Sequence, residues 1–137
     1  MLKVEHIGIA VKNLEKSNDL FQKLFGKEKY KVETVESEQV STAFFQIGET
    51  KIELLESTGP GSAIGKYIEK RGEGIHHIAY EVADIHSEID RLKSEGFTVL
   101  NETPKKGADN KLVSFLHPKS TNGVLVELCQ EITASSD

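Results

Sequence analysis

Two histidines and two glutamates recur at matching places along this chain. His6 and His77 each begin an apolar, strand-like segment, and Glu53 and Glu127 each interrupt a later apolar segment of the same kind. Imidazole nitrogens and carboxylate oxygens are ligands that Zn²⁺, Co²⁺, Ni²⁺ and Mn²⁺ accept in proteins. A duplicated unit that supplies one histidine and one glutamate from each copy therefore predicts one shared metal site.

The strands that carry these four residues have one polar and one apolar face. Side chains alternate across a strand, so His6 shares a face with Gly8, and His77 shares a face with Ala79. The neighbouring isoleucines, valines and leucines point the other way and are expected to pack on helices. A single histidine of this kind is most often a core residue and a single glutamate most often solvated, but their recurrence in both copies favours the metal site.

The same order of elements, β-α-β-β-β, is predicted in both copies. Asn13 and Asp84 are expected to begin the helices as N-caps, and Gly26 to end the first one. An apolar stripe is expected on the first helix, made of Leu14, Leu20, Phe21, Leu24 and Phe25. The predicted first copy has a strand at 2–11, a helix at 13–25 and strands near 29–36, 40–47 and 51–56. The predicted second copy has a strand at 75–82, a helix at 84–95 and strands near 97–101, 112–117 and 123–129.

The chain is expected to form one α+β domain over residues 1–137. Its predicted parts are module one at about 2–56, a connecting segment at 57–74, module two at about 75–130 and a frayed polar tail at 131–137. The connecting segment should hold a short helix that includes Ile64, Tyr67 and Ile68. Residues 102–111 should form a long loop.

The charge, the apolar runs and the cysteine content of the chain limit the partners and the location that are expected. The net charge of −5 argues against nucleic acid as a partner. No apolar run is long enough to span a membrane, and the first residues enter a strand, so neither a membrane span nor a signal peptide is expected. The single cysteine, Cys129, excludes an internal disulfide and fits a reducing compartment, so a cytoplasmic location is expected.

At these residues the chain resembles the vicinal oxygen chelate superfamily (glyoxalases, bleomycin resistance proteins and dioxygenases), in which paired βαβββ modules form an open, metal-lined, barrel-like cleft. Within it the sequence is most similar to the methylmalonyl-CoA epimerases. The resemblance runs from about Val4 to Gln130. Its motifs are HIGIAV at 6–11, IELL at 52–55, GIHHIA at 74–79, FLHPK at 115–119 and GVLVEL at 123–128.

This resemblance implies that His6, Glu53, His77 and Glu127 bind the metal, with Co²⁺ as the most active ion and Mn²⁺, Zn²⁺ or Ni²⁺ as alternatives. It implies removal of a proton between a thioester and a carboxylate, a metal-stabilised enolate, and reprotonation on the opposite face. Glu127, and by pseudo-symmetry Glu53, are expected to transfer the protons. Some relatives carry a second catalytic carboxylate where Thr42 stands, and a threonine cannot serve as that base.

The partners implied are an acyl-CoA substrate and a second copy of the chain in a homodimer. Lys105, Lys106 and Lys119 are expected near the substrate as phosphate contacts for CoA, together with Lys111. His117 is expected either to cap the loop that follows it or to form a pocket wall. Ordinary solvated lysines are at least as good an interpretation. His76, which faces away from His77, is expected to be structural, and His86 to lie on the surface.

Three other functions stay open from the sequence. A glyoxalase-like lyase would use the same four ligands equally well. An iron dioxygenase would use two histidines and one carboxylate, and the fourth ligand at Glu53 counts against it. A metal-free small-molecule binding module would need none of these polar strand residues.

Overall fold

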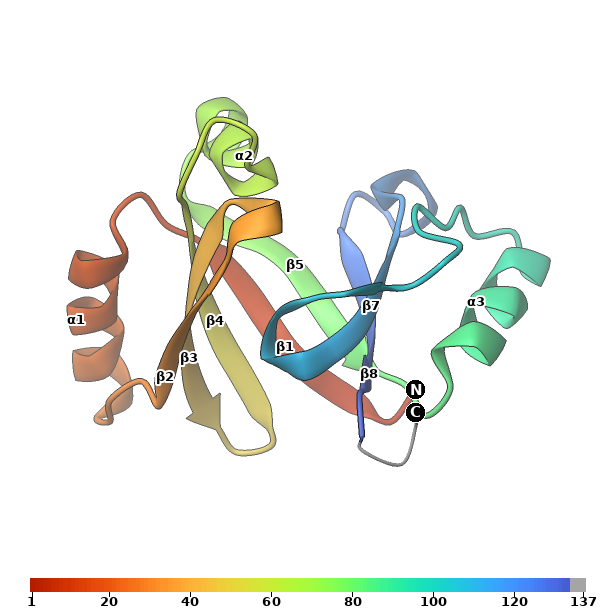
Figure 1. Cartoon of the computed structure of the whole chain (residues 1–137), viewed down its shortest axis with the longest axis horizontal. Coiled ribbons are helices and arrows are strands. Elements are labelled where there is room, and N and C mark those ends of the chain that lie inside the picture. Colours follow the sequence, from red (N-terminus) through yellow and green to blue (C-terminus); the bar gives the residue numbers. More distant parts are fainter. Residues whose placement is uncertain (134–137) are drawn as a thin grey trace. The chain divides into compact units, whose positions relative to one another are not determined.

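A computed structural model describes residues 1–133 of the chain, and these residues form two compact units. We call residues 6–76 the N-terminal unit. The C-terminal unit consists of residues 1–5 together with the chain from His77 onward. Each unit combines a mixed sheet with helix, which is the α+β class predicted from the sequence (Figure 1).

The N-terminal unit has four neighbouring strands in the order β2-β3-β4-β1. Strand β1 pairs with β4 in parallel, whereas β2–β3 and β3–β4 are antiparallel. The elements are β1 (Lys3–Ala10), α1 (Leu14–Phe25), β2 (Lys31–Val35), the 3₁₀ turn η1 (Glu36–Glu38), β3 (Val40–Ile47), β4 (Thr50–Ser57) and α2 (Ala63–Arg71).

The C-terminal unit repeats this plan with the strand order β5-β8-β7-β6. Strand β5 pairs with β8 in parallel, and β8–β7 and β7–β6 are antiparallel. The elements are β5 (Gly74–Glu81), α3 (Ile85–Ser94), β6 (Lys105–Lys106), η2 (Ala108–Asn110), β7 (Lys111–Leu116), η3 (Pro118–Ser120) and β8 (Val126–Glu131).

The predicted helix signals are confirmed. The side chain of Asn13 accepts a hydrogen bond from the backbone N–H of Lys16 at 2.9 Å, and that of Asp84 accepts from the N–H of Ser87 at 3.2 Å. Gly26 has a φ of 70°, the left-handed conformation in which a residue without a Cβ ends a helix at least cost. Local sequence chemistry therefore sets both ends of α1 and the start of α3.

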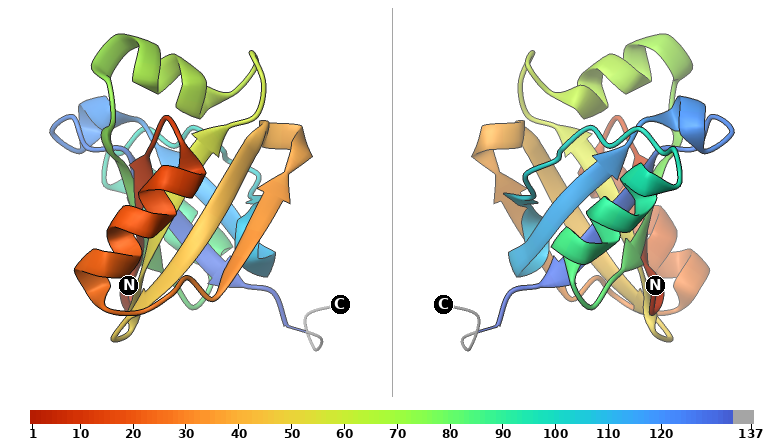
Figure 2. Two further views of the ribbon diagram at one scale, coloured as in Figure 1. Left: turned by 90° about the vertical axis from the view of Figure 1, so that its left-hand side faces the viewer. Right: turned by 90° about the vertical axis from the view of Figure 1, so that its right-hand side faces the viewer.

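Each long helix packs on the face of its sheet that carries the aliphatic residues (Figure 2). In the C-terminal unit Ile85, Ile89 and Leu92 are buried against Val126 and Leu128. In the N-terminal unit the helix residues that pack are Leu14, Phe21 and Phe25, and their partners include Ile9, Phe45, Ile52 and Leu54.

The predicted stripe on α1 is wrong at two positions. Leu20 and Leu24 are 62% and 68% exposed. Successive helix residues are rotated by about 100°, so these two leucines, each one residue before a partly buried phenylalanine, face away from the sheet. The connecting helix α2 does bury Ile64, with Tyr67 and Ile68 packed beside it.

Three predictions for the second copy also need correction. Residues 97–101 form no strand, only a bridge between Val99 and Leu116, because the side chain of Asn101 takes over the ladder by accepting the N–H of Phe115 at 3.0 Å. The loop 102–111 contains β6 and η2. The tail begins later than predicted, since β8 runs to Glu131 and the N–H of Ile132 donates to the carbonyl of Asn110; residues 134–137 lie outside the described part.

Candidate active site

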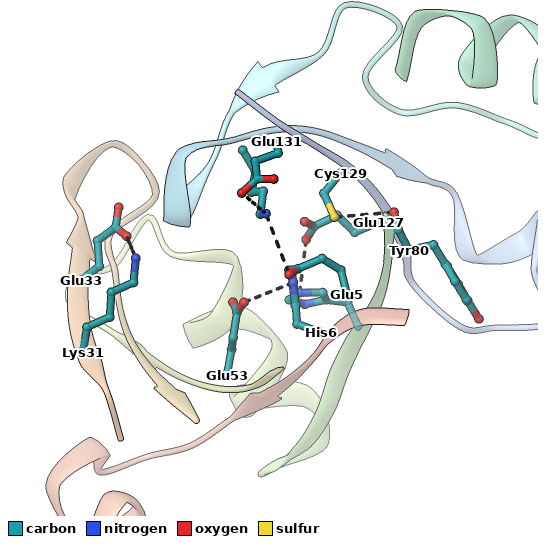
Figure 3. Close-up of polar contacts among 11 residues, drawn as sticks. Glu5, His6, Lys31, Glu33, Glu53, Tyr80, Glu127, Cys129 and Glu131 are labelled. Atoms are coloured by element: carbon teal, nitrogen blue, oxygen red, sulfur yellow. Dashed lines mark hydrogen bonds and ion pairs between the residues drawn. The ribbon is translucent and has the colours of Figure 1, made fainter. Parts of the chain in front are cut away.

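His6 and Glu53 form a buried pair in the N-terminal unit. The Nδ1 of His6 lies 3.2 Å from the Oε2 of Glu53, and the two residues are only 5% and 4% exposed (Figure 3). In the parallel β1–β4 register Glu53 lies opposite Gly8, so both side chains belong to the face that the alternation predicted.

His77 and Glu127 form the equivalent pair in the C-terminal unit. The Nε2 of His77 lies 3.2 Å from the Oε1 of Glu127, and both residues are 6% exposed. Strand register places Glu127 opposite Ala79, which occupies the position of Gly8 in the other copy. The structure therefore joins the four predicted residues in two pairs, one in each unit, at matching strand positions. The two pairs differ in the imidazole nitrogen that faces the glutamate, which is Nδ1 in His6 and Nε2 in His77.

Both pairs have the donor chemistry of a divalent metal site. Burial of an ionised carboxylate is costly unless charges or hydrogen bonds offset it. A divalent cation held between an imidazole nitrogen and a carboxylate oxygen supplies such a charge, and this donor set suits Zn²⁺, Co²⁺, Mn²⁺ and Ni²⁺. The residues present thus fit the metal that the resemblance implied.

Each glutamate strand also fixes the start of a helix, a feature that the sequence analysis missed. The Oε1 of Glu56 on β4 accepts the N–H of Leu14 at 2.6 Å, and the Oε1 of Gln130 on β8 accepts the N–H of Ile85 at 2.7 Å. Both acceptors stand three residues after a glutamate of the pairs. The matching positions of Glu56 and Gln130 in the two copies were the sequence signal from which this role could have been predicted.

The wall beside the second pair is apolar. Ala79, Val113 and Cys129 are buried together, and the ring of Phe115 lies edge-on to His77 with 6.0 Å between centroids. Burial, followed by the nearby charge of Glu127, raises the pKa of the Cys129 thiol far above its usual range. The sulfur lies 3.6 Å from the carbonyl of Tyr80. Cys129 is therefore a packing residue whose thiol is protonated, and it offers no thiolate ligand.

Thr42 is buried in β3 on the face that also carries Glu53. The antiparallel register sets Phe44 opposite Glu53, and Thr42 lies two residues along β3 on that same side. Thr42 therefore lies near Glu53 across the two neighbouring strands, but its side chain carries a hydroxyl group and no carboxylate.

The lysines predicted near the substrate do not gather in one group. Lys105 and Lys106 are exposed on β6, beside the first half of β7, while Lys119 lies in η3 beyond the other end of β7. Lys111 is buried at the start of β7, with its Nζ 3.9 Å from Glu5 and 3.8 Å from Glu131. Lys111 is therefore buried in an internal ion-pair group. Its place in the sequence, between a turn and a strand, did not indicate this burial.

The three remaining histidines have different surroundings. The ring of His76 lies edge-on to Tyr67, whose hydroxyl donates to the carbonyl of Ile75 at 2.7 Å, so His76 has a packing role. His86 is exposed in the first turn of α3. His117 is half-buried just after β7, and its Nδ1 accepts the N–H of Lys119.

Comparison with known proteins decides the family. The model of the glyoxalase/bleomycin resistance protein/dioxygenase superfamily matches residues 5–115. The chain belongs to this superfamily. The resemblance to this superfamily that the sequence motifs indicated is thereby confirmed.

Several relatives inside the superfamily are named as methylmalonyl-CoA epimerases. The chain is 44% identical over 130 residues to an ethylmalonyl-CoA/methylmalonyl-CoA epimerase of Cereibacter sphaeroides, covering 93% of this chain and 97% of that one. It is 44% identical over 127 residues to the mitochondrial methylmalonyl-CoA epimerase of Dictyostelium discoideum, covering 92% and 76%. The structure of a methylmalonyl-CoA epimerase in complex with methylmalonyl-CoA and NH₄⁺ matches with a TM-score of 0.92 at 34% identity, covering 97% and 96%.

These matches confirm the predicted fold class. A TM-score of 0.92 over nearly the whole of both chains means that the superfamily's α+β fold is the fold of this protein. In the described residues no helix is long and apolar enough to cross a membrane.

Proposed function

We propose that this protein is a metal-dependent epimerase that interconverts (R)- and (S)-methylmalonyl-CoA. The observation that carries the proposal is the buried His–Glu contact that recurs at matching strand positions in both units. Several relatives of this chain are named for this reaction. Neither glyoxalase nor dioxygenase chemistry has comparable support among these relatives.

In this proposal the two units form one domain, and His6, Glu53, His77 and Glu127 bind a single ion. The recurrence of a buried glutamate beside a histidine in both units supports this, because one metal ion would interact favourably with both carboxylates. Co²⁺ is the ion that the resemblance favours. When bound, the ion supplies electrostatic stabilisation of the negative charge that develops on the substrate as the α-proton leaves.

The protein's own side chains move the protons. Glu127 takes the α-proton on one face of the substrate, for which a carboxylate oxygen must come within about 3 Å of that proton. Glu53 returns a proton on the opposite face, as the repeat of the two pairs suggests. Ala79 and Gly8 keep the neighbouring strand positions small, so that the acyl group has space beside the carboxylates.

The other parts of the proposal concern partners and location. The CoA phosphates contact Lys105, Lys106 or Lys119, whose ammonium groups are charge partners for phosphate. The protein is a homodimer, which sedimentation equilibrium measures directly. A cytoplasmic location is supported by the buried, unpaired Cys129, since free thiols persist in reducing compartments.

Proton exchange in deuterated buffer tests the proposed reaction. Wild type loaded with Co²⁺ should incorporate deuterium at the α-carbon of methylmalonyl-CoA and invert its configuration, as followed by NMR. E127Q and E53Q should each lose inversion by about 100-fold or more, which is the usual contribution of a general acid or base. Because each glutamate serves one face, either variant alone should still exchange the α-proton of one epimer without inverting it.

E131Q is the matched control, since Glu131 lies on the same strand as Glu127 with an exposed side chain. Metal content is measured for every variant, so that lost metal is distinguished from a lost base. Full exchange and inversion in both E127Q and E53Q, with metal bound, would refute the assigned roles. Conversion of a hemithioacetal with no action on methylmalonyl-CoA would overturn the function itself.

A further inference from the structure

The face of β7 that borders the His77–Glu127 pair carries a row of side chains. Phe115 lies opposite Glu127 in the antiparallel register, and residues opposite each other in such a pair share a face of the sheet. Its ring also contacts that of His77. Val113, two residues earlier, packs against Ala79 on this face. Val113 and Phe115 therefore line one side of the His77–Glu127 pair.

His117 is the next member of this row. It follows the last residue of β7 in an extended conformation, with φ −64° and ψ 131°, and its N–H donates to the carbonyl of Thr98 at 2.8 Å. Two residues along a strand span about 7 Å, so His117 stands roughly that far along the sheet from the register position of Phe115 and Glu127. A malonyl group is of this size.

The surrounding turn fixes the imidazole of His117. Its Nδ1 accepts the N–H of Lys119 at 3.0 Å, and its carbonyl accepts the N–H of Ser120 at 3.0 Å and the hydroxyl of Ser120 at 2.8 Å. A neutral imidazole whose Nδ1 is an acceptor carries its hydrogen on Nε2. Within residues 1–133 this Nε2–H has no hydrogen-bond partner.

We propose that the Nε2–H of His117 donates a hydrogen bond to an oxygen of the substrate's acyl group, and so helps to determine which acyl-CoA the protein accepts. This inference rests on the proposed function and adds a substrate-contacting residue to it. Acyl oxygens suit this donor because the carboxylate is negative from the start and the thioester oxygen becomes negative as the α-proton leaves. Hydrogen bonds to charged oxygens are the strong ones.

Two variants separate the turn from the donor. In H117N the Asn Oδ1 can still accept the N–H two residues on, as in an Asx-turn, but the distal donor is gone. In H117Q the amide N–H₂ replaces the distal donor, while the short turn contact is lost. If the donor matters, H117N should lose about 10- to 100-fold in kcat/KM at unchanged Tm, and H117Q should stay within about 5-fold of wild type.

Binding measured by calorimetry on the metal-loaded protein tests the contact without catalysis. Malonyl-CoA, propionyl-CoA and free CoA are the probes, and H86Q, altered at the exposed histidine of α3, is the matched control. Weaker binding of malonyl-CoA alone by H117N identifies the carboxylate as the acceptor, and weaker binding of malonyl-CoA and propionyl-CoA identifies the thioester oxygen.

Two results would overturn the inference. H117N could bind all three probes and turn over substrate like wild type, or it could lose affinity for free CoA as well, which would place His117 at the CoA end. Either result would leave the exchange and inversion by wild type intact, so the inference and the proposed function fail separately.

Discussion

Glu53 and Glu127 are acidic side chains that the fold keeps away from water, each beside one imidazole. Burial of an ionised carboxylate costs several kcal/mol unless charge and hydrogen bonds offset it. Both copies of the repeat retain this arrangement at the same strand positions, next to residues as small as Gly8 and Ala79. The recurrence of a buried carboxylate beside a histidine in both copies is the feature that indicates a functional site.

At the residue scale, the burial of Cys129 predicts how slowly its thiol reacts. Because burial raises its pKa, the thiolate form should be absent at neutral and mildly alkaline pH, and the native protein should react with iodoacetamide at least 100-fold more slowly than protein unfolded in urea. Mass spectrometry of timed samples at pH 8 measures the rate.

A double variant provides the control for this measurement. C129A/S94C carries its only thiol at the exposed end of α3 and should be labelled at nearly the same rate in native and unfolded protein. Native wild type labelled as quickly as this variant would contradict the assignment of Cys129 to the interior.

At the scale of elements, a strand and a helix are joined by one side-chain contact in each unit. Glu56 and Gln130 accept the first N–H of α1 and of α3, groups that have no partner inside their own helices. The strand that carries the glutamate of each pair thus also anchors the helix on the other face of the sheet. One side-chain hydrogen bond in each unit therefore links the position of the helix to the strand that carries the buried glutamate.

Loss of this contact should lower stability. Q130L removes the acceptor and leaves the N–H of Ile85 without its partner, so the free energy of unfolding in urea should fall by about 1–2 kcal/mol. Q130E keeps an acceptor and reproduces the acidic residue of the other copy, so it should stay within about 0.5 kcal/mol of wild type, aided by its negative charge at a helix N-terminus. Equal stability of Q130L and wild type would exclude a structural role for the contact.

The period of the apolar residues predicted most elements, because alternation and helical spacing act locally. It failed where a single side chain competes with the backbone: the Asn101 amide replaces a ladder bond and leaves only a bridge where a strand was expected. Lys111 shows a second limit. Its burial depends on Glu5, more than a hundred residues away in the sequence, and no local pattern contains that contact.

At the scale of the whole molecule, the proposed sharing of one ion by both copies has a direct consequence for stoichiometry. Titration of metal-free protein with Co²⁺, followed by calorimetry and elemental analysis, should saturate at one ion per chain. E53L and E127L should each weaken that single binding event, by about 10-fold or more, although the two residues belong to different units.

Independent sites would behave differently. Two ions per chain, or one variant that leaves the affinity unchanged, would mean that each His–Glu pair binds its own ion. The metal should also raise Tm in proportion to the logarithm of its free concentration, since it binds the folded protein.

The boundary between the two compact units does not coincide with the boundary between the two copies of the repeat. The first five residues belong to the first copy by sequence, yet they fold with the second: the N–H of Leu2 donates to the carbonyl of Glu81, the N-terminal amine lies 3.5 Å from Glu88, and Glu5 pairs with Lys111. A chain that carried one copy alone could not make these contacts within itself. Its leading segment would find such partners only on a second copy, so each copy depends on the other for a complete set of contacts.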